Sequence, residues 1–292
     1  MRFAVFDGNR LGVLDPGDRN GLVDVTDLVP GPCGPGGPLQ RLIEEGRVVG
    51  RDDLAGRPRR PLSDVVLDAP LPRPGKVVGA PVNYRDHQAE MREEHSIADL
   101  GVFLKASSSV VGPDGVVELP YSDVRTDQEG ELVVVIGRRG RHIPAGRAIG
   151  HVFGYTCGLD MTVRSTEDRS ARKSFDTFSP LGPYVVTTDE IDDPGRLDLT
   201  CRVGGSVRQH TSTAALIFGV PELVAYTSSV MTLHPGDVIF TGTPAGVGPV
   251  SDGDRVEVDI EGVGLLAVTV SAAGARPYAR RPRPTLIPAA AE

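Results

Sequence analysis

The chain has 292 residues, of which 24% are charged and 39% are apolar, so it can bury a sizeable core. These proportions exclude a fully disordered chain, a collagen-like repeat and a coiled coil. With 31 Lys and Arg against 39 Asp and Glu, the formal net charge is −8, and an acidic chain without a basic stripe is a poor binder of nucleic acid.

The first 70 residues are predicted to form a small N-terminal α/β module. Short β-like runs occur over 2–6, 11–14 and 22–25, and an amphipathic helix is expected over 38–47. A Pro-rich connector over 67–75 marks the domain boundary, which we place between residues 70 and 71.

Residues 71–274 are predicted to form the main domain, and many short strands with few helices indicate a β-rich mixed α/β fold. Asn83 is expected to cap a short helix. Residues 275–292 are dense in Arg and Pro and are expected to form an extended tail. The predicted elements are strands at 76–79, 130–136, 152–159 and 238–241, helices at 84–94 and 221–233, and a closing hairpin of 256–260 with 265–270.

No apolar run is long enough to cross a bilayer, and the start of the chain meets charge and glycine too early for a signal peptide. We therefore expect a cytoplasmic protein with no membrane partner. The three cysteines, Cys33, Cys157 and Cys201, form no CxxC pair and predict neither a disulfide framework nor a thiolate zinc site.

Glu129 and Glu131 stand two residues apart at the start of the predicted strand over 130–136, so their side chains point to the same face. Two such carboxylates repel each other unless a cation lies between them or one is protonated. Hard divalent metals prefer oxygen ligands. Alternatively, the two glutamates are solvated on an exposed strand face, although the apolar run that follows favours burial and a counter-charge.

Asp160 ends the predicted strand over 152–159, a position where ligand residues are common, and Arg164 follows four residues later. The pair is either a local salt bridge at a helix start or a contact for a substrate anion.

His87 and Glu90 are spaced three residues apart on the predicted helix over 84–94 and can share one face. A neutral imidazole beside a carboxylate can activate water, although the mixed charges beyond it also suit a surface helix. The segment 241–248 offers exposed amides and a hydroxyl for an anionic ligand, or it is an ordinary glycine-rich turn.

Between residues 76 and 244 the chain carries a series of short motifs, and together they resemble the fumarylacetoacetate hydrolase family. All three lysines of the chain, Lys76, Lys105 and Lys173, fall inside these motifs. The motifs are KVVG (76–79), NYRDH (83–87), FLK (103–105), VGP (111–113), EGEL (129–132), FGYT (153–156), KSFDTF (173–178), LGP (181–183), PGD (235–237) and TGTP (241–244).

The resemblance implies a β-sandwich roll, a homodimer and a divalent metal, Mg²⁺ or Mn²⁺. The branch is most similar to bacterial 2-hydroxyhepta-2,4-diene-1,7-dioate isomerase-like members. It implies the following roles: metal ligands Glu129, Glu131 and Asp160; catalytic residues His87, Glu90 and Lys173; substrate-binding residues Tyr84, Arg164, Gly242 and Thr243.

The chain departs from its relatives in Gln128, where tyrosine or histidine is frequent, and in Ser165, where aspartate is frequent. We expect a metal-dependent enzyme that acts on small 2-oxo or 1,3-dicarbonyl acids through a metal enolate, hydrolysing a C–C bond as in acylpyruvates. The same centre would serve an isomerase or a decarboxylase of related dioates. A non-catalytic, metal-stabilised binding protein is the third alternative.

Overall fold

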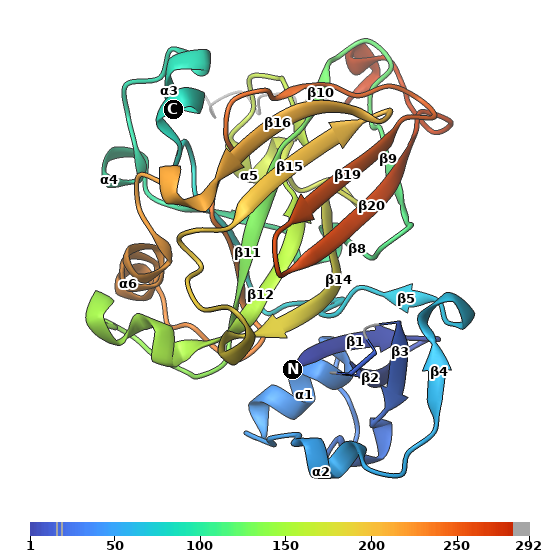
Figure 1. Ribbon diagram of the computed structural model, residues 1–292. Helices are drawn as coiled ribbons and strands as arrows, with labels where there is room; N and C mark the ends of the chain where they lie inside the picture. Colours follow the sequence, from blue (N-terminus) through green and yellow to red (C-terminus); the bar gives the residue numbers. More distant parts are fainter. Residues whose placement is uncertain (16, 19, 283–292) are drawn as a thin grey trace, which may run out of the picture.

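Strands dominate the computed structural model, which describes residues 1–15, 17, 18 and 20–282 (Figure 1). The β-rich mixed α/β class expected from the sequence is confirmed. The α-helices of the described residues are short: α1 (Gly37–Glu44), α2 (Arg51–Leu54), α3 (Arg85–Met91), α4 (Ile97–Leu100), α5 (Arg169–Arg172) and α6 (Val220–Val230).

The largest sheet joins strands from both ends of the main domain with strands of the N-terminal module. The main order is β4 (Arg59–Pro61), β3 (Gly21–Asp24), β2 (Arg10–Leu14), β1 (Arg2–Phe6), β14 (Ser179–Thr187), β12 (Val152–Leu159), β11 (Gly130–Ile136), β17 (Val238–Phe240), β6 (Val77–Gly79) and β7 (Phe103–Lys105). Beside this path, β5 (Leu67–Asp68) pairs with β1, and β8 (Val110–Val111) pairs with β14.

A five-stranded sheet packs over β11, β12 and β14 and forms a sandwich with them (Figure 1). A further three-stranded sheet lies at the end of β11 where the chain enters that strand. The five-stranded sheet has the order β16 (Ser206–Ser212), β15 (Asp198–Val203), β19 (Arg255–Ile260), β20 (Gly264–Ser271) and β9 (Val116–Glu118), and the three-stranded sheet has the order β13 (Thr162–Val163), β10 (Thr126–Gln128) and β18 (Gly248–Pro249).

The continuous apolar sequence of β11 follows from burial on both faces. Its even-numbered residues, from Leu132 to Ile136, belong to the core shared with the five-stranded sheet. Val133 and Val135 belong to a second core that includes side chains of β1, β2 and α1. A strand that is half exposed would alternate apolar and polar residues, whereas this one has no solvated face.

The N-terminal strands continue the main sheet because β1 pairs antiparallel with β14, Arg2 opposite Val186 and Phe3 opposite Val185. The ring of Phe3 also lies against that of Phe153, with centroids 5.6 Å apart. Backbone hydrogen bonds of one sheet thus connect the segments before and after the predicted boundary between residues 70 and 71. The division into two domains at this boundary stays a prediction.

The predicted helix over 84–94 is shorter in the structure, and Asn83 does not cap it. Tyr84 occupies the N-cap position of α3 and makes no side-chain cap hydrogen bond. Asn83 instead donates from Nδ2 to the carbonyls of Phe218 and Thr241, and its Oδ1 accepts the N–H of Phe218. The prediction that Asn83 caps the helix is wrong because its side-chain amide hydrogen-bonds backbone groups that are distant in the sequence.

Of the predicted tail, residues 283–292 lie outside the described residues. In the described part, the ring of Tyr278 packs edge-on against Tyr121 with centroids 4.9 Å apart, and its hydroxyl donates to Glu167. None of the described helices combines the length and the apolar character that a bilayer-spanning helix needs.

Gly154, opposite Thr187 in the β12–β14 pairing, tests how tightly the two strands pack. A Cβ at this position would lie 2.1 Å from the carbonyl oxygen of Val186, which is backbone and cannot rotate away. We expect Gly154→Ala to lower the free energy of unfolding by about 1–3 kcal/mol, measured by thermal and urea denaturation. Gly146→Ala is the control, because nothing lies within 4 Å of its Cβ position. Equal stability of the two variants would contradict this account of the packing.

Candidate active site

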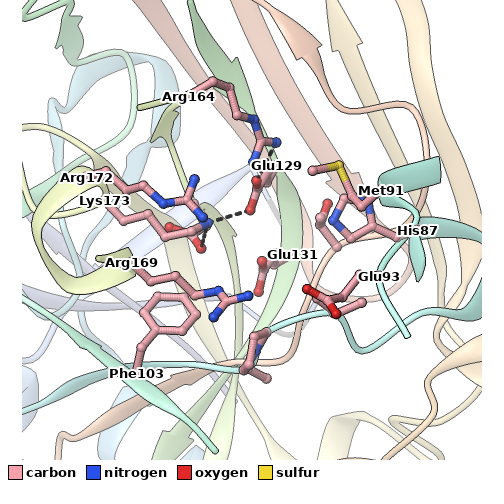
Figure 2. Close-up of a pocket in the computed structure, with 15 residues that line it drawn as sticks. His87, Met91, Glu93, Phe103, Glu129, Glu131, Arg164, Arg169, Arg172 and Lys173 are labelled. Atoms are coloured by element: carbon pink, nitrogen blue, oxygen red, sulfur yellow. Dashed lines mark hydrogen bonds and ion pairs between the residues drawn. The ribbon is translucent and has the colours of Figure 1, made fainter. Parts of the chain in front are cut away.

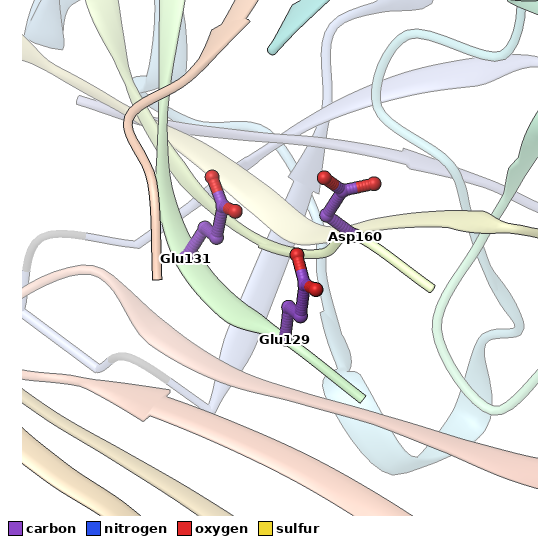
Figure 3. Close-up of side chains that lie close together, drawn as sticks. All are labelled: Glu129, Glu131 and Asp160. Atoms are coloured by element: carbon purple, nitrogen blue, oxygen red, sulfur yellow. The ribbon is translucent and has the colours of Figure 1, made fainter. Parts of the chain in front are cut away.

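Three buried carboxylates converge where β11 begins and β12 ends. Residues Gly130 and Leu159 are paired in the β11–β12 register, and the N–H of Asp160 donates to the carbonyl of Glu129 at 2.9 Å. One oxygen each from Glu129, Glu131 and Asp160 lies within 4.8 Å of the others. Figure 3 shows the three side chains directed toward a common space. The i, i+2 spacing predicted the shared face of the two glutamates, and the register adds the aspartate.

Two buried lysines and a partly buried arginine compensate the charge of two of these carboxylates. Nζ of Lys173 donates to Glu129 Oε2 at 2.7 Å and to Asp160 Oδ2 at 2.6 Å. Nζ of Lys105 donates to Asp160 Oδ1 at 2.6 Å, and Arg164 donates to Glu129 Oε1 at 2.9 Å. Since a buried charge without a partner is costly, these contacts offset the cost of burying Glu129 and Asp160.

The third carboxylate, Glu131, has no such compensation. Burial, followed by repulsion from Asp160 and Glu129, raises the pKa of Glu131 well above its ordinary value. Burial would also raise the pKa of Glu129, but the nearby cationic groups, Lys173 and Arg164 foremost, together outweigh burial and hold that pKa below the usual range. Glu131 Oε2 accepts only the neutral N–H of Gly242, at 2.6 Å, and no lysine or arginine of the described residues forms an ion pair with it.

The donor set suits a divalent cation. Carboxylate oxygens are hard ligands of the kind that Mg²⁺ prefers, and Mn²⁺ accepts the same donors. Each carboxylate offers about four lone-pair sites, so the contacts with lysine and arginine do not exhaust them. A cation at this point would also favour the ionised form of Glu131, whose pKa is otherwise raised. Glu129, Glu131 and Asp160 could therefore hold such an ion.

His87, on α3, faces the same pocket from another wall (Figure 2). Its Nδ1 lies 3.0 Å from Glu90 Oε2, and the two residues are one helical turn apart, as their spacing predicted. The other oxygen of Glu90 accepts the N–H of Gly246 at 3.0 Å, which fixes the carboxylate. This pairing engages Nδ1 and leaves Nε2 of the imidazole for the pocket, where no described residue hydrogen-bonds it.

The glycine-rich segment after β17 closes over the start of β11. Gly242 has φ +100°, and a Cβ there would lie 2.6 Å from the Cβ of Asn83, so a glycine is needed at this position. Oγ1 of Thr243 donates to the carbonyl of Gly130 at 3.0 Å and accepts from Gln209 Nε2 at 2.7 Å. The segment is thus a fixed wall of the site rather than a loose turn.

A pocket of about 170 Å³ lies over the carboxylates. Glu90 reaches it only through His87, and Gly242 contributes only through its N–H to Glu131. Tyr84 does not line the pocket: it is fully buried, and its hydroxyl has no hydrogen-bond partner among the described residues. The predicted residues that do line the pocket are His87, Glu129, Glu131, Asp160, Arg164, Lys173 and Thr243.

Besides Glu93, which lines the pocket, four charged residues of the site were not assigned a role from the sequence. Lys105 contacts Asp160. The sequence signal that could have pointed to a role for Lys105 was the scarcity of lysine, since the chain has only three. Asp127, fully buried, accepts from Arg164 Nε at 2.7 Å and so orients that guanidinium. Arg169 and Arg172 line the pocket from α5, and no pattern in the sequence separated them from the many other arginines.

The comparison with known protein families decides the family. Residues 76–271 match the family described as fumarylacetoacetate (FAA) hydrolase C-terminal. The chain belongs to this family. The matched range contains all three carboxylates, His87 and Lys173, so the fumarylacetoacetate hydrolase domain is the part of the chain that carries the site.

Individual members of the fumarylacetoacetate hydrolase family are similar over nearly the whole chain. The maleylpyruvate hydrolase of Aquipseudomonas alcaligenes is 40% identical over 284 residues, covering 92% of this chain and 99% of that protein. A crystal structure of maleylpyruvate hydrolase from Sphingobium sp. SYK-6 in complex with manganese(II) and pyruvate is 39% identical, with a TM-score of 0.82 and coverages of 93% and 99%. A 5-carboxymethyl-2-hydroxymuconate delta-isomerase from Mycobacterium smegmatis is 33% identical, with a TM-score of 0.74 and coverages of 94% and 100%.

Metal binding is expected to stabilise the folded protein, because the unfolded chain does not hold the three carboxylates together. At a free Mn²⁺ concentration about 100 times the dissociation constant, the gain is ~2.7 kcal/mol. We expect Mn²⁺ or Mg²⁺ to raise the melting temperature of chelator-treated protein, and Glu131→Gln to remove that shift. Glu118→Gln, an exposed glutamate on β9, is the matched control and should keep it. If metal raised the melting temperature of Glu131→Gln as much as that of the wild type, Glu131 would be excluded as a metal ligand.

Proposed function

We propose that the chain is a divalent-metal-dependent hydrolase that cleaves the C–C bond of an acylpyruvate, a 2,4-dioxo acid. The observation that carries the proposal is the pocket itself, in which His87 paired with Glu90 faces three buried carboxylates, one of which has no ion-pair partner among the described residues. The names of the two maleylpyruvate hydrolases, one of them in complex with manganese and pyruvate, support the same substrate class.

In the proposed reaction, a bound divalent ion would supply Lewis-acid polarisation of the 2-oxo carbonyl. His87 Nε2 takes a proton from water while Glu90 holds the imidazole through Nδ1, and the resulting hydroxide adds to the distal carbonyl carbon. The C–C bond then breaks, its electron pair passing to the departing carbon as an enolate. The proton held on His87 returns to that carbon, so one water is consumed and two acids leave.

Lys173 supplies positive charge where the enolate develops. Its Nζ lies between Glu129 and Asp160, and burial would lower its pKa, but Asp160 and Glu129 outweigh burial and raise that pKa. The ammonium is therefore kept protonated and fixed in place before substrate arrives. A preorganised cation in a site screened from water stabilises developing negative charge more than solvent does.

The alternative is an isomerase that moves a proton through the same enolate without cleavage. The similarity to the 5-carboxymethyl-2-hydroxymuconate delta-isomerase from Mycobacterium smegmatis supports this alternative. The two reactions differ in their need for water activation, because only hydrolysis requires a hydroxide at the distal carbonyl. The His87–Glu90 pair is therefore the part of the site that separates them.

We expect His87→Ala to lower kcat for acylpyruvate hydrolysis by a factor on the order of 10²–10⁴, the usual contribution of a positioned general base. His142→Ala, which removes an exposed imidazole outside the pocket, should retain wild-type kcat. Product analysis in ¹⁸O-labelled water should place one label in the acid released from the distal carbonyl. Unchanged turnover in His87→Ala, or proton exchange without cleavage by the wild type, would favour the isomerase instead.

A further inference from the structure

His87 and Glu90 both belong to α3, so their contact with each other does not fix them relative to the three carboxylates. Figure 2 shows the imidazole of His87 projecting from α3 into the pocket. Among the described residues, the carboxylate of Glu90 has one partner outside its own helix, the N–H of Gly246, which donates to Oε1 at 3.0 Å. The position of the His87–Glu90 pair therefore depends on where the chain holds Gly246.

The side chain of Gln128 holds Gly246 through the opposite side of its backbone. Nε2 of Gln128 donates to the carbonyl of Gly246 at 3.0 Å, and Oε1 accepts the N–H of Gly248 at 3.1 Å. Gln128 and Gly248 lie opposite each other in the β10–β18 pairing. One amide thus bonds both a carbonyl and an N–H of the segment, which a side chain with only a donor or only an acceptor cannot do.

The segment around Gly246 has little room to move away from this amide. Gly246 has φ +98°, and a Cβ there would lie 2.0 Å from the carbonyl oxygen of Arg208, so its backbone lies directly against β16. A second buried glutamine, Gln209, donates from Nε2 to the carbonyl of Pro244 at 2.8 Å. The segment is therefore fixed on both sides of Gly246, with the N–H of that residue directed at Glu90.

Gln128 is fully buried and does not line the pocket, so any effect it has on the reaction passes through other residues. It directly precedes Glu129, at the point where β10 leads into β11, and successive side chains of an extended chain point to opposite sides. Glu129 accordingly lines the pocket, whereas Gln128 bonds the segment that holds Glu90. Two neighbouring residues thus place a candidate metal ligand and the anchor of the candidate general base.

We propose that Gln128 is a positioning residue for the His87–Glu90 pair. It holds Gly246 so that the N–H of this glycine fixes Glu90, and Glu90 keeps the proton of the imidazole on Nδ1. Nε2 of His87 is thereby left basic and directed at the pocket. The inference rests on the proposed function for the role of Nε2 as the base that takes a proton from water.

The tautomer of His87 tests the positioning without reference to activity. In protein with ¹⁵N-labelled histidine, the chemical shift distinguishes a protonated ring nitrogen from an unprotonated one, and the His87 signal is identified by its loss in His87→Ala. In Mg²⁺-loaded wild type in mildly alkaline buffer, where imidazole is ordinarily neutral, we expect the proton on Nδ1. Gln128→Met resembles glutamine in shape but makes neither hydrogen bond, and should shift the ring toward a mixture of both tautomers.

A double-mutant cycle shows whether the effect on turnover passes through Glu90. Gln128→Met should lower kcat for acylpyruvate hydrolysis by a factor on the order of 10 to 100, because a displaced base slows the step. KM and the affinity for Mn²⁺ should stay unchanged, because the three carboxylates are not altered. In a Glu90→Ala background, Gln128→Met should lower kcat by no more than about twofold further, since the residue through which it acts is already absent.

Gln40→Met makes the same chemical change on α1, outside the pocket, and should keep the wild-type tautomer and kcat. If Gln128→Met does not fold, Gln128→Asn replaces it, because the same amide on a side chain one methylene shorter cannot bond both Gly246 and Gly248. The proposal is overturned if the wild type lacks the proton on Nδ1, or if the variant at position 128 keeps the wild-type tautomer. An equal loss of kcat with and without Glu90 would also overturn it, since the effect would then be a general one on the fold.

The two measurements separate this inference from the proposed function. If the wild type cleaves no acylpyruvate but Gln128→Met changes the tautomer of His87, the hydrolase is rejected and the positioning role stands. If the wild type cleaves acylpyruvates and Gln128→Met keeps both the tautomer and the kcat of the wild type, the positioning role alone is rejected.

Discussion

Repulsion between carboxylates that the fold brings together is the interaction on which the site depends. Glu129, Glu131 and Asp160 are each at most 4% exposed, so water cannot screen their charges. Two lysines and an arginine offset part of this repulsion, and burial together with the remaining repulsion raises the pKa of Glu131. A cation bound at this point would offset the remaining repulsion, so the arrangement of the three carboxylates suits a divalent metal.

The sandwich supplies the rigidity that such a charge cluster needs. β11 and β12 carry the carboxylates at their adjoining ends, and β11 is packed on both faces by separate apolar cores. Displacing either strand would expose apolar side chains as well as separate the charges from their partners. The cost of holding like charges together is therefore met by burial elsewhere in the sheet.

Two short helices on different walls of the pocket bring further charged and titratable side chains to the carboxylates held by this rigid sheet. α3 brings His87 with its fixed carboxylate partner, and α5 leads into Lys173 and carries two arginines. In the proposed function, the carboxylates would bind the 2-oxo acid end of the substrate, and the two helices would meet the remainder of it.

Local periodicity in the sequence was sufficient to predict several of the site's residue pairs. The period of two placed Glu129 and Glu131 on one face, the i, i+3 spacing paired His87 with Glu90, and the ordered motifs identified the family, because these features depend on neighbouring residues alone. By contrast, Lys105 contacts Asp160, 55 positions further along the chain, Asn83 binds a distant loop instead of capping its helix, and the α5 arginines face the pocket. These facts depend on which strands pair, in which register, and on what each side chain finds when it is buried. Sequence therefore determined the chemical groups and their local spacing, and only the tertiary structure decided which charges were balanced and which were left for a ligand.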